Sequence, residues 1–414
     1  MTELIERSGA DTATGGAASA RFPTRLTSGM ARGPRAAAIL VAVLLVAGGI
    51  SVIVAATAGS TPGATRPATH PYKTVTLVSP AYKPTASVGT TDDYHCTLLN
   101  PHVKQDAYVI SSQFKAGSPE DHHAILSLVP PSLAATALSD NAATGGNGWT
   151  CFGAPSLPKA SILQLFDTPW LSVWAPGHGA DTLPRGTGIS LPAGSLVIMQ
   201  VHYNLLVGDK PVQNSLVLDT VPVSKAVAPL HLDLQFAPPD IPCPAGVTGP
   251  LCDRTASLAD QGRRFGSDAV QTVDFIELGC GNNISDPPAG DTASCTQSIG
   301  RAGYIDRVQG HMHLLGTKFS MILNPGTPQA KTVLNVPNYN FDYQKAYNLS
   351  TPIPVKAGDK IQINCTYNPR LAQELPILRK APPHFVTWGD GSTDEMCLGL
   401  VWTSKSLPNS HSSA

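Results

Sequence analysis

The chain has 414 residues, a formal net charge of −1 at pH 7 and 14% charged residues. This balance excludes a large basic surface that could follow a phosphate backbone, so we expect no nucleic-acid partner. A single hydrophobic core stops growing at about 250–300 residues, so the length favours two domains. The 37 Gly and 37 Pro residues favour short strands and turns over long helices, which predicts an all-β protein.

The N-terminal part predicts a membrane anchor. Residues 1–35 are rich in Ala, Gly, Ser and Thr without apolar periodicity and are predicted to be a disordered cytoplasmic segment. Residues 36–58 carry no charge and, as a transmembrane helix, would span roughly 35 Å, enough to cross a bilayer. The preceding segment contains Arg21, Arg25, Arg32 and Arg35. Because Lys and Arg near a membrane span stay on the cytoplasmic side, we expect a single-pass cell-membrane protein with extracytoplasmic domains. The alternative is a signal peptide cleaved after ATA (56–58), which would give a secreted protein.

Residues 59–88 are predicted to be a flexible linker, because prolines alternate there with small polar residues. After this linker, short apolar runs between Gly and Pro turns indicate strands. The clearest runs are AILSLV (124–129), SLVIMQVHYN (195–204) and KIQINCTYN (360–368).

The strand-rich region divides near its middle. The Pro-rich stretch 227–244 is the best candidate boundary. We therefore expect one domain at 89–228, a second at 229–405 and a disordered tail at 406–414.

Every cysteine follows the predicted membrane span. An even number of cysteines in an exported region indicates disulfides and an oxidising compartment, although spacing alone does not fix the pairing. No CxxC is present, which argues against a zinc ribbon. The cysteines are Cys96, Cys151, Cys243, Cys252, Cys280, Cys295, Cys365 and Cys397.

Histidines inside apolar strand patterns are the main chemical signal, because imidazole is the commonest metal ligand. His311 and His313 stand two apart, so on a strand both side chains leave one face and can share a metal ion. His122 and His123 are adjacent, so joint ligation requires a distortion such as a bulge. His202, taken alone, is more typical of a core or surface histidine.

Met396 changes this balance, because a methionine in the polar loop GDGSTDEMC (389–397) is not typical core filler. A thioether is a soft ligand that suits copper, particularly Cu(I). Methionine together with two histidines therefore indicates copper.

The motifs HHAILSLV, VIMQVHYN, GHMHLLG, INCTYN and STDEMCLG occur in the order seen in the copper type II, ascorbate-dependent monooxygenases. Peptidylglycine-hydroxylating and dopamine beta-hydroxylating enzymes are familiar members. The resemblance runs from TDDYHC (91–96) to MCLGLVW (396–402). It implies two tandem antiparallel β-sandwich, jelly-roll-like domains, with two coppers facing one another across a solvent-filled cleft.

The resemblance also implies the ligands. His122, His123 and His202 would hold an electron-transferring copper in the first domain. His311, His313 and Met396 would hold the catalytic, oxygen-activating copper in the second. The implied reaction hydroxylates a C–H bond of a small organic substrate with O2 and a small reductant, either ascorbate or a similar donor.

The resemblance further implies disulfides Cys365–Cys397, next to Met396, and Cys96–Cys151. Short separation makes Cys243–Cys252 and Cys280–Cys295 the remaining predicted pairs. For the acids Asp394 and Glu395, orientation of the ligands and ordinary loop solvation are both open.

The chain departs from the peptide-amidating members, which bind a substrate carboxylate with an arginine two residues before H-x-H and an Asn-x-Tyr after Met-Cys. Here these positions are Gln309, Leu398 and Leu400. The means of pairing a carboxylate is therefore missing. Leu398 and Leu400 suggest an apolar pocket wall, although strand alternation could equally place them in the core. Our hypothesis is a small apolar or aromatic substrate.

Three rival functions remain. The strongest is a non-catalytic extracytoplasmic copper-binding module, which keeps the ligands without oxygen chemistry. A purely adhesive pair of β-sandwiches would need the ordered ligand motifs to be coincidence. A zinc hydrolase is disfavoured because Met396 would be an odd ligand and no HExxH motif is present.

Overall fold

The computed structural model describes residues 72–86, 91–152, 157, 169–205 and 208–407. The predicted cytoplasmic segment 1–35 and transmembrane helix 36–58 lie outside these residues, as do residues 408–414 of the predicted tail. No helix in the described part is long and apolar enough to cross a membrane.

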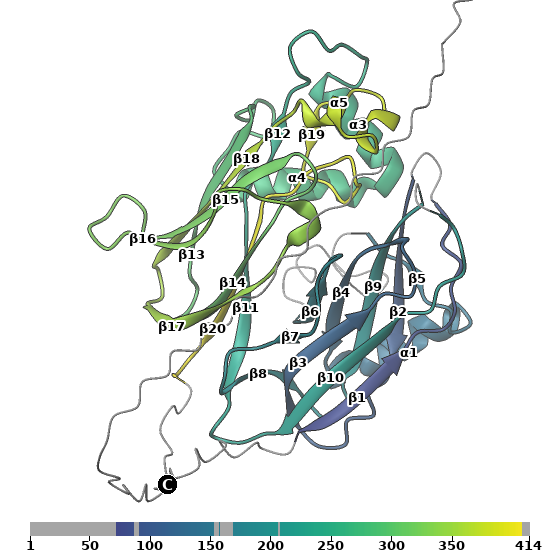
Figure 1. Cartoon of the computed structure of the whole chain (residues 1–414), viewed down its shortest axis with the longest axis vertical. Helices are drawn as coiled ribbons and strands as arrows, with labels where there is room; N and C mark the ends of the chain where they lie inside the picture. Colours follow the sequence, from purple (N-terminus) through teal and green to yellow (C-terminus); the bar gives the residue numbers. More distant parts are fainter. Residues whose placement is uncertain (1–71, 87–90, 153–156, 158–168, 206–207, 408–414) are drawn as a thin grey trace, which may run out of the picture. The chain divides into compact units, whose positions relative to one another are not determined.

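The described chain is mostly β, as predicted, and its strands form four sheets (Figure 1). The largest sheet contains, in spatial order, β1 (Lys73–Val78), β10 (Ser215–Pro222), β3 (Ala107–Lys115), β8 (Thr187–Leu191), β11 (Ala228–Phe236), β20 (Leu398–Ser404), β14 (Gly303–His311) and β17 (Tyr347–Val355). A short strand, β7 (Asp181–Thr182), pairs with β3.

Two further sheets complete the body of the fold. The five-stranded sheet has the order β5 (Trp149–Thr150), β2 (Asp92–Leu99), β9 (Leu196–Asn204), β4 (Asp121–Val129) and β6 (Trp170–Trp174). The four-stranded sheet has the order β13 (Thr292–Ser298), β18 (Lys360–Tyr367), β15 (Gly316–Leu323) and β16 (Lys331–Val336). A fourth sheet pairs β12 (Asp240–Ile241) with β19 (Val386–Thr387).

The five-stranded and four-stranded sheets contribute to two separate hydrophobic cores, and the largest sheet contributes to both. Leu126 and Met199 of the five-stranded sheet cluster with Leu216 of β10. Ile363 of the four-stranded sheet clusters with Ile305 of β14. Burial of alternate side chains between facing sheets is the main stabilising contribution in such arrangements.

The largest sheet continues through the predicted domain boundary. β11 pairs in parallel with β8 through Ala228 and Pro229, and antiparallel with β20 along Leu230–Phe236. The domain boundary between residues 228 and 229 stays a prediction, because β11 pairs with a strand from each of the two predicted domains.

The predicted flexible linker 59–88 is wrong over residues 73–78, which form β1 and pair with β10. In the six-residue run KTVTLV, polar and apolar residues alternate only from Thr74 to Leu77, a short pattern that nearby prolines obscured. Further along the same stretch, the Tyr82 hydroxyl donates to Asp93 Oδ2 at 2.8 Å.

The prediction of an all-β protein also missed several helices. They are α1 (Pro131–Ala143), α3 (Arg254–Phe265), α4 (Ser267–Gly279) and α5 (Leu371–Glu374), with 3-10 turns η1 (Phe341–Tyr343) and η2 (Leu378–Lys380). The buried face of α3 consists of Ser257, Gln261 and Phe265, so apolar periodicity did not reveal it.

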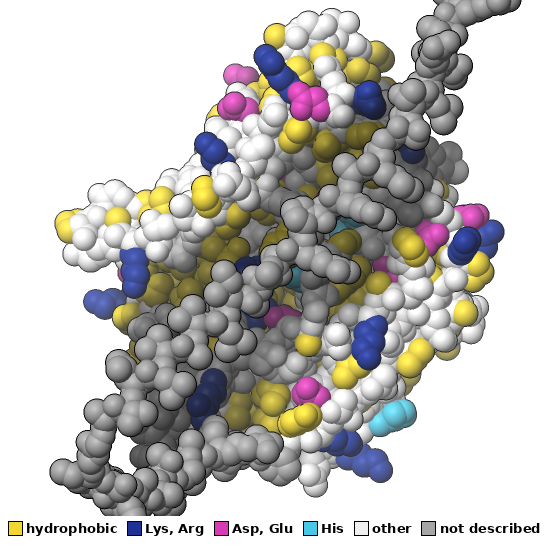
Figure 2. All heavy atoms as spheres, viewed as in Figure 1, with side chains coloured by type: hydrophobic (Ala, Val, Ile, Leu, Met, Phe, Trp, Pro, Cys, Tyr) yellow, Lys and Arg dark blue, Asp and Glu magenta, His cyan; other side chains and the backbone are white. Residues whose placement is uncertain are grey.

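All four predicted disulfides are present: Cys96–Cys151, Cys243–Cys252, Cys280–Cys295 and Cys365–Cys397. On the outside of the molecule, Lys and Arg side chains are spread among Asp and Glu on the face in view, without one continuous basic patch (Figure 2).

Candidate metal site

Three histidines converge on the five-stranded sheet. In the pairing of β4 with β9, Asp121 is opposite Tyr203 and His123 is opposite His202, so His122 is an extra residue in a bulge. This is the distortion that joint ligation required. One ligand nitrogen from each of His122, His123 and His202 lies within 4.8 Å of the others.

The three imidazoles turn their Nδ1 atoms toward one another. His202 Nδ1 lies 3.0 Å from His122 Nδ1 and 3.3 Å from His123 Nδ1. His202 Nε2 lies 2.7 Å from Asp92 Oδ1, so a proton on Nε2 leaves Nδ1 with a lone pair. Converging lone pairs repel unless a proton or cation lies among them, so this set fits a metal ion.

Asp92 on β2 is buried and orients this set. Burial alone would raise the pKa of Asp92, but hydrogen bonds from His202 and Ser392 and the charge of His202 together lower it. The side chain therefore stays ionised, which favours a proton on His202 Nε2. Tyr94, also on β2, stacks on the His202 ring at 4.1 Å between centroids.

The second set begins where β14 ends. β14 ends at His311, so His313 lies beyond the strand, contrary to the expectation of one regular strand. The two rings nevertheless lie 5.2 Å apart. His311 Nδ1 is 2.6 Å from Gln344 Oε1, and His313 Nδ1 is 3.0 Å from the Asp394 carbonyl. Both histidines therefore keep Nε2 available to bind a metal ion.

Burial keeps these imidazoles neutral. It lowers the pKa of His313 to about 3, with the charge of His311 acting in the same direction. Burial also lowers the pKa of His311, and it lowers those of His122 and His123 well below the usual value, with neighbouring imidazoles adding to the effect. A neutral imidazole is the form that binds metal.

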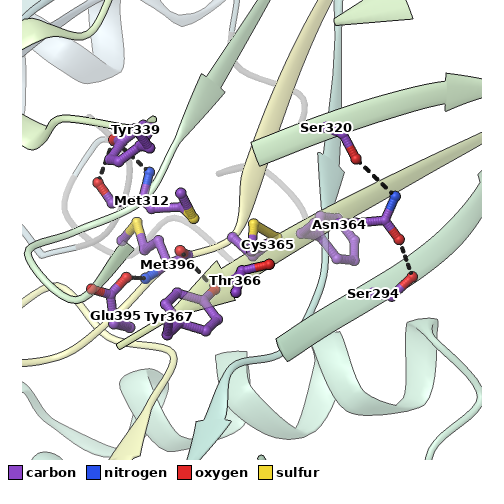
Figure 3. Close-up of a disulfide and its surroundings, with 12 residues drawn as sticks. Ser294, Met312, Ser320, Tyr339, Asn364, Cys365, Thr366, Tyr367, Glu395 and Met396 are labelled. Carbon is purple, nitrogen blue, oxygen red and sulfur yellow. Dashed lines mark hydrogen bonds between the residues drawn. A yellow bond between two sulfur atoms is a disulfide. The ribbon is translucent and has the colours of Figure 1, made fainter. Parts of the chain in front are cut away.

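Met396 is fixed by its backbone (Figure 3). Its N–H donates to Glu395 Oε2 at 3.1 Å, and the Tyr367 hydroxyl donates to its carbonyl at 3.1 Å. The next residue, Cys397, is joined to Cys365 of β18. The backbone that carries the thioether is therefore held in place.

Glu395 links Met396 to the histidines of the second set. Its carboxylate also accepts from the His313 N–H at 2.8 Å and from the Leu315 N–H at 2.6 Å. Burial raises the pKa of Glu395 to about 8, while these backbone hydrogen bonds act in the opposite direction. Such buried contacts support ligand orientation rather than loop solvation.

The loop before Met396 is held from two sides. On one side, Arg264 of α3 pairs with Asp394 at 2.9 Å, and Gln261 donates to the Trp388 carbonyl at 2.5 Å. On the other side, Ser392 donates to Asp92 Oδ1 at 2.7 Å, and the Tyr94 hydroxyl donates to the Asp390 carbonyl. Asp92 therefore contacts both His202 of the first set and the loop of the second.

One cavity borders both sets. Its lining includes His123 from the first set, and His311 and Met396 from the second. Leu398 and Leu400 also line it while belonging to a hydrophobic core, so both predicted placements apply. The expected solvent-filled cleft corresponds here to a cavity lined mainly by apolar side chains.

The second ligand set lies in a region with a recognisable family pattern. Residues 292–407 match copper type II ascorbate-dependent monooxygenase, C-terminal domain. This copper monooxygenase match includes His311, His313 and Met396, whereas His122, His123 and His202 lie outside the matched range.

Likenesses to solved structures are weak. Allantoicase from Saccharomyces cerevisiae is 7% identical, with 78% of this chain and 80% of that chain covered and a TM-score of 0.20. A fucolectin from striped bass serum is 8% identical, with coverages of 80% and 96% and a TM-score of 0.16. TM-scores this low support no inference about fold or function.

Several residues of the site were missed by sequence reasoning. Asp92 and Tyr94 belong to the TDDYHC motif, which served only to mark the start of the resemblance. Gln344 follows the short turn η1 and gave no signal in the sequence, although it contacts His311. Asp92 and Tyr94 lie two residues apart on β2, the strand that pairs with the strand of His202. The alternation of side chains along these two strands was the one sequence pattern that could have pointed to them.

Proposed function

We propose that this protein is a copper-dependent monooxygenase that hydroxylates a C–H bond of a small organic substrate with O2 and a one-electron reductant such as ascorbate. The observation that carries the proposal is the cavity bordered by His123 on one side and by His311 and Met396 on the other. A substrate there would contact the second set while remaining near the first. The family match over residues 292–407 supports the same chemistry.

Both donor sets fit copper. Three imidazoles form the first set, and two imidazoles with a thioether form the second. A methionine ligand is unusual for zinc but suits copper, particularly Cu(I). When bound, copper supplies one-electron redox chemistry and activation of O2.

The residues divide these tasks. His122, His123 and His202 would hold the electron-transferring copper, with Asp92 fixing the proton of His202 at Nε2. His311, His313 and Met396 would hold the catalytic copper beside substrate. Gln344 and the Asp394 carbonyl keep the Nε2 atoms of the second set available.

The proposed domains follow from this division. The region 89–228 would carry the electron-transferring site and the region 229–405 the catalytic site. Both would lie outside the cell, attached through residues 36–58 or released by cleavage. The four disulfides support an oxidising compartment.

The test compares the wild-type full-length protein with Met396→Leu, which removes the sulfur and keeps an apolar side chain of similar volume. Copper per chain and ascorbate-driven O2 uptake are measured with a panel of small aromatic and aliphatic compounds. We expect two coppers and substrate-stimulated uptake in the wild type. Met396→Leu should keep the first-set copper and lose at least about 100-fold in turnover, the scale seen when one key catalytic interaction is removed.

Met321→Leu is the matched control, because Met321 is a buried methionine of the four-stranded sheet that is not one of the proposed ligands. It should retain turnover. Bound copper without substrate-coupled O2 uptake would instead identify a copper-binding module. Full activity in Met396→Leu would refute the assigned role of the thioether.

A further inference from the structure

One wall of the cavity is a single face of the largest sheet. Leu234 of β11, Leu400 of β20 and Gln309 of β14 are opposite one another in register. One row along, Leu398 is opposite His311. Because side chains alternate along a strand, residues two apart share a face, and both rows point into the cavity. A ligand on this face therefore contacts leucine side chains next to His311.

The remaining walls are rich in aromatic rings. Trp170 and Trp174 of β6 line the cavity together with Trp388, and all three are buried. Phe341 lies 5.0 Å from the His122 ring and also lines the cavity. Large rigid aromatic surfaces favour flat or alkyl groups that can give up contact with water.

The charges available to a ligand are few. No lysine or arginine belongs to the described residues that line the cavity, and Asp390 is the one acid among them. A carboxylate would therefore lose its water without gaining a cationic partner, which is strongly unfavourable. The polar side chains in the wall include neutral amides such as Gln309, which replaces the arginine of the peptide-amidating pattern.

We propose that this cavity binds an uncharged aromatic or alkyl group and selects against carboxylates. The identification of that group as the substrate rests on the proposed monooxygenase function. The selectivity itself depends only on the cavity walls, so it can be measured on the protein without copper or O2.

The experiment uses three compounds that share a phenyl ring with a two-carbon chain: ethylbenzene, phenethylamine and 3-phenylpropionate. At pH 7 they are neutral, cationic and anionic. Binding to the full-length copper-free protein is followed by tryptophan fluorescence, because three tryptophans line the cavity. We expect ethylbenzene to bind more tightly than phenethylamine, and with a Kd at least about tenfold lower than that of 3-phenylpropionate.

Gln309→Arg tests the wall directly. A guanidinium at this position can pair with a carboxylate, so the preference should reverse toward 3-phenylpropionate. Gln309→Leu should keep or strengthen the preference for ethylbenzene. Gln329→Arg adds the same charge at an exposed position in the loop between β15 and β16 and should leave all three affinities unchanged.

Each outcome decides the proposal. Equal or tighter binding of phenethylamine would mean that Asp390 pairs with an amine, and the proposal would be wrong. Preference for 3-phenylpropionate in the wild type, or no binding of any compound, would also overturn it. Selective ethylbenzene binding without copper-dependent turnover would refute the monooxygenase function and leave the cavity assignment intact.

Discussion

The two ligand sets are held in position by different parts of the structure. His123 and His202 stand opposite each other on adjacent strands of one sheet, with His122 added by a bulge. His311 ends a strand, whereas His313 and Met396 lie in loops. The first set is therefore positioned by strand pairing. The second depends on separate contacts that fasten loops to their surroundings.

This difference matches the tasks proposed for the sets. A set embedded in paired strands keeps its geometry with little rearrangement, which suits electron transfer. A set at a strand end and in a loop can border the cavity, as His311 and Met396 do. The geometry of the second set therefore depends on Glu395, on the Cys365–Cys397 disulfide and on α3.

Removal of the Cys365–Cys397 disulfide should have the largest effect on the difference between the two sets. Cys365→Ala with Cys397→Ala should lower the free energy of unfolding by about 3–4 kcal/mol, the scale for closing a loop of this length. The bond spans 32 residues and adjoins Met396. We expect the second-set copper to be lost while the first-set copper remains, as measured by copper per chain and by denaturant unfolding.

Removal of Cys96–Cys151 is the matched control. This bond spans 55 residues and begins on β2, beside the first set. A similar loss of stability is expected, with the copper loss now confined to the first set. Identical copper loss in both variants would show that the sets do not have separate supports.

Asp92 tests the support of the first set. Asp92→Asn removes the charge that holds the proton on His202 Nε2. Loss of such a partner weakens metal binding by about 10- to 100-fold, so the first-set copper affinity should fall by that factor. Copper titration against a competing chelator measures it.

The control for this change is Asp219→Asn, which alters a partly exposed carboxylate that accepts a hydrogen bond from Thr74. Its copper affinities should equal those of the wild type. An unchanged first-set affinity in Asp92→Asn would show that Asp92 has only a structural role.

The smallest expected effect is that of mild acid. Burial holds the pKa of His313 at about 3 and lowers that of His311. A folded-state pKa below the usual value of about 6.5 means that protons compete with copper only at lower pH. Copper should therefore stay on the second set at pH 5.5 and leave as the pH falls toward 3.

Metal analysis after dialysis at pH 7, 5.5, 4 and 3 tests this order. Release of half the second-set copper near pH 6.5 would mean that the histidines titrate like exposed imidazoles. The burial that lowers their pKa would then not persist in solution.

Parts of the fold and site followed directly from the sequence. The runs around residues 124–129 and 195–204 predicted β4 and β9, because apolar β-rich segments between turns form strands. A bulge at His122 was expected on the condition that the adjacent His122 and His123 bind one metal ion. By contrast, β1 lay hidden among prolines, and α3 buries Ser257 and Gln261 for hydrogen bonds that no local pattern reveals.

The sequence by itself determined the chemical types of the donors, the four disulfide pairs as predictions, and the loss of the arginine at Gln309. The donor types depend on residue identity, and the pairs Cys243–Cys252 and Cys280–Cys295 on short spacing, whereas Cys96–Cys151, Cys365–Cys397 and the missing arginine were implied by the family resemblance. Only the tertiary structure decided that Asp92 contacts both His202 and Ser392, 300 residues away from it, and that tryptophans from different segments enclose one cavity. Such contacts arise from sheet pairing and packing between distant segments, and no local pattern encodes them.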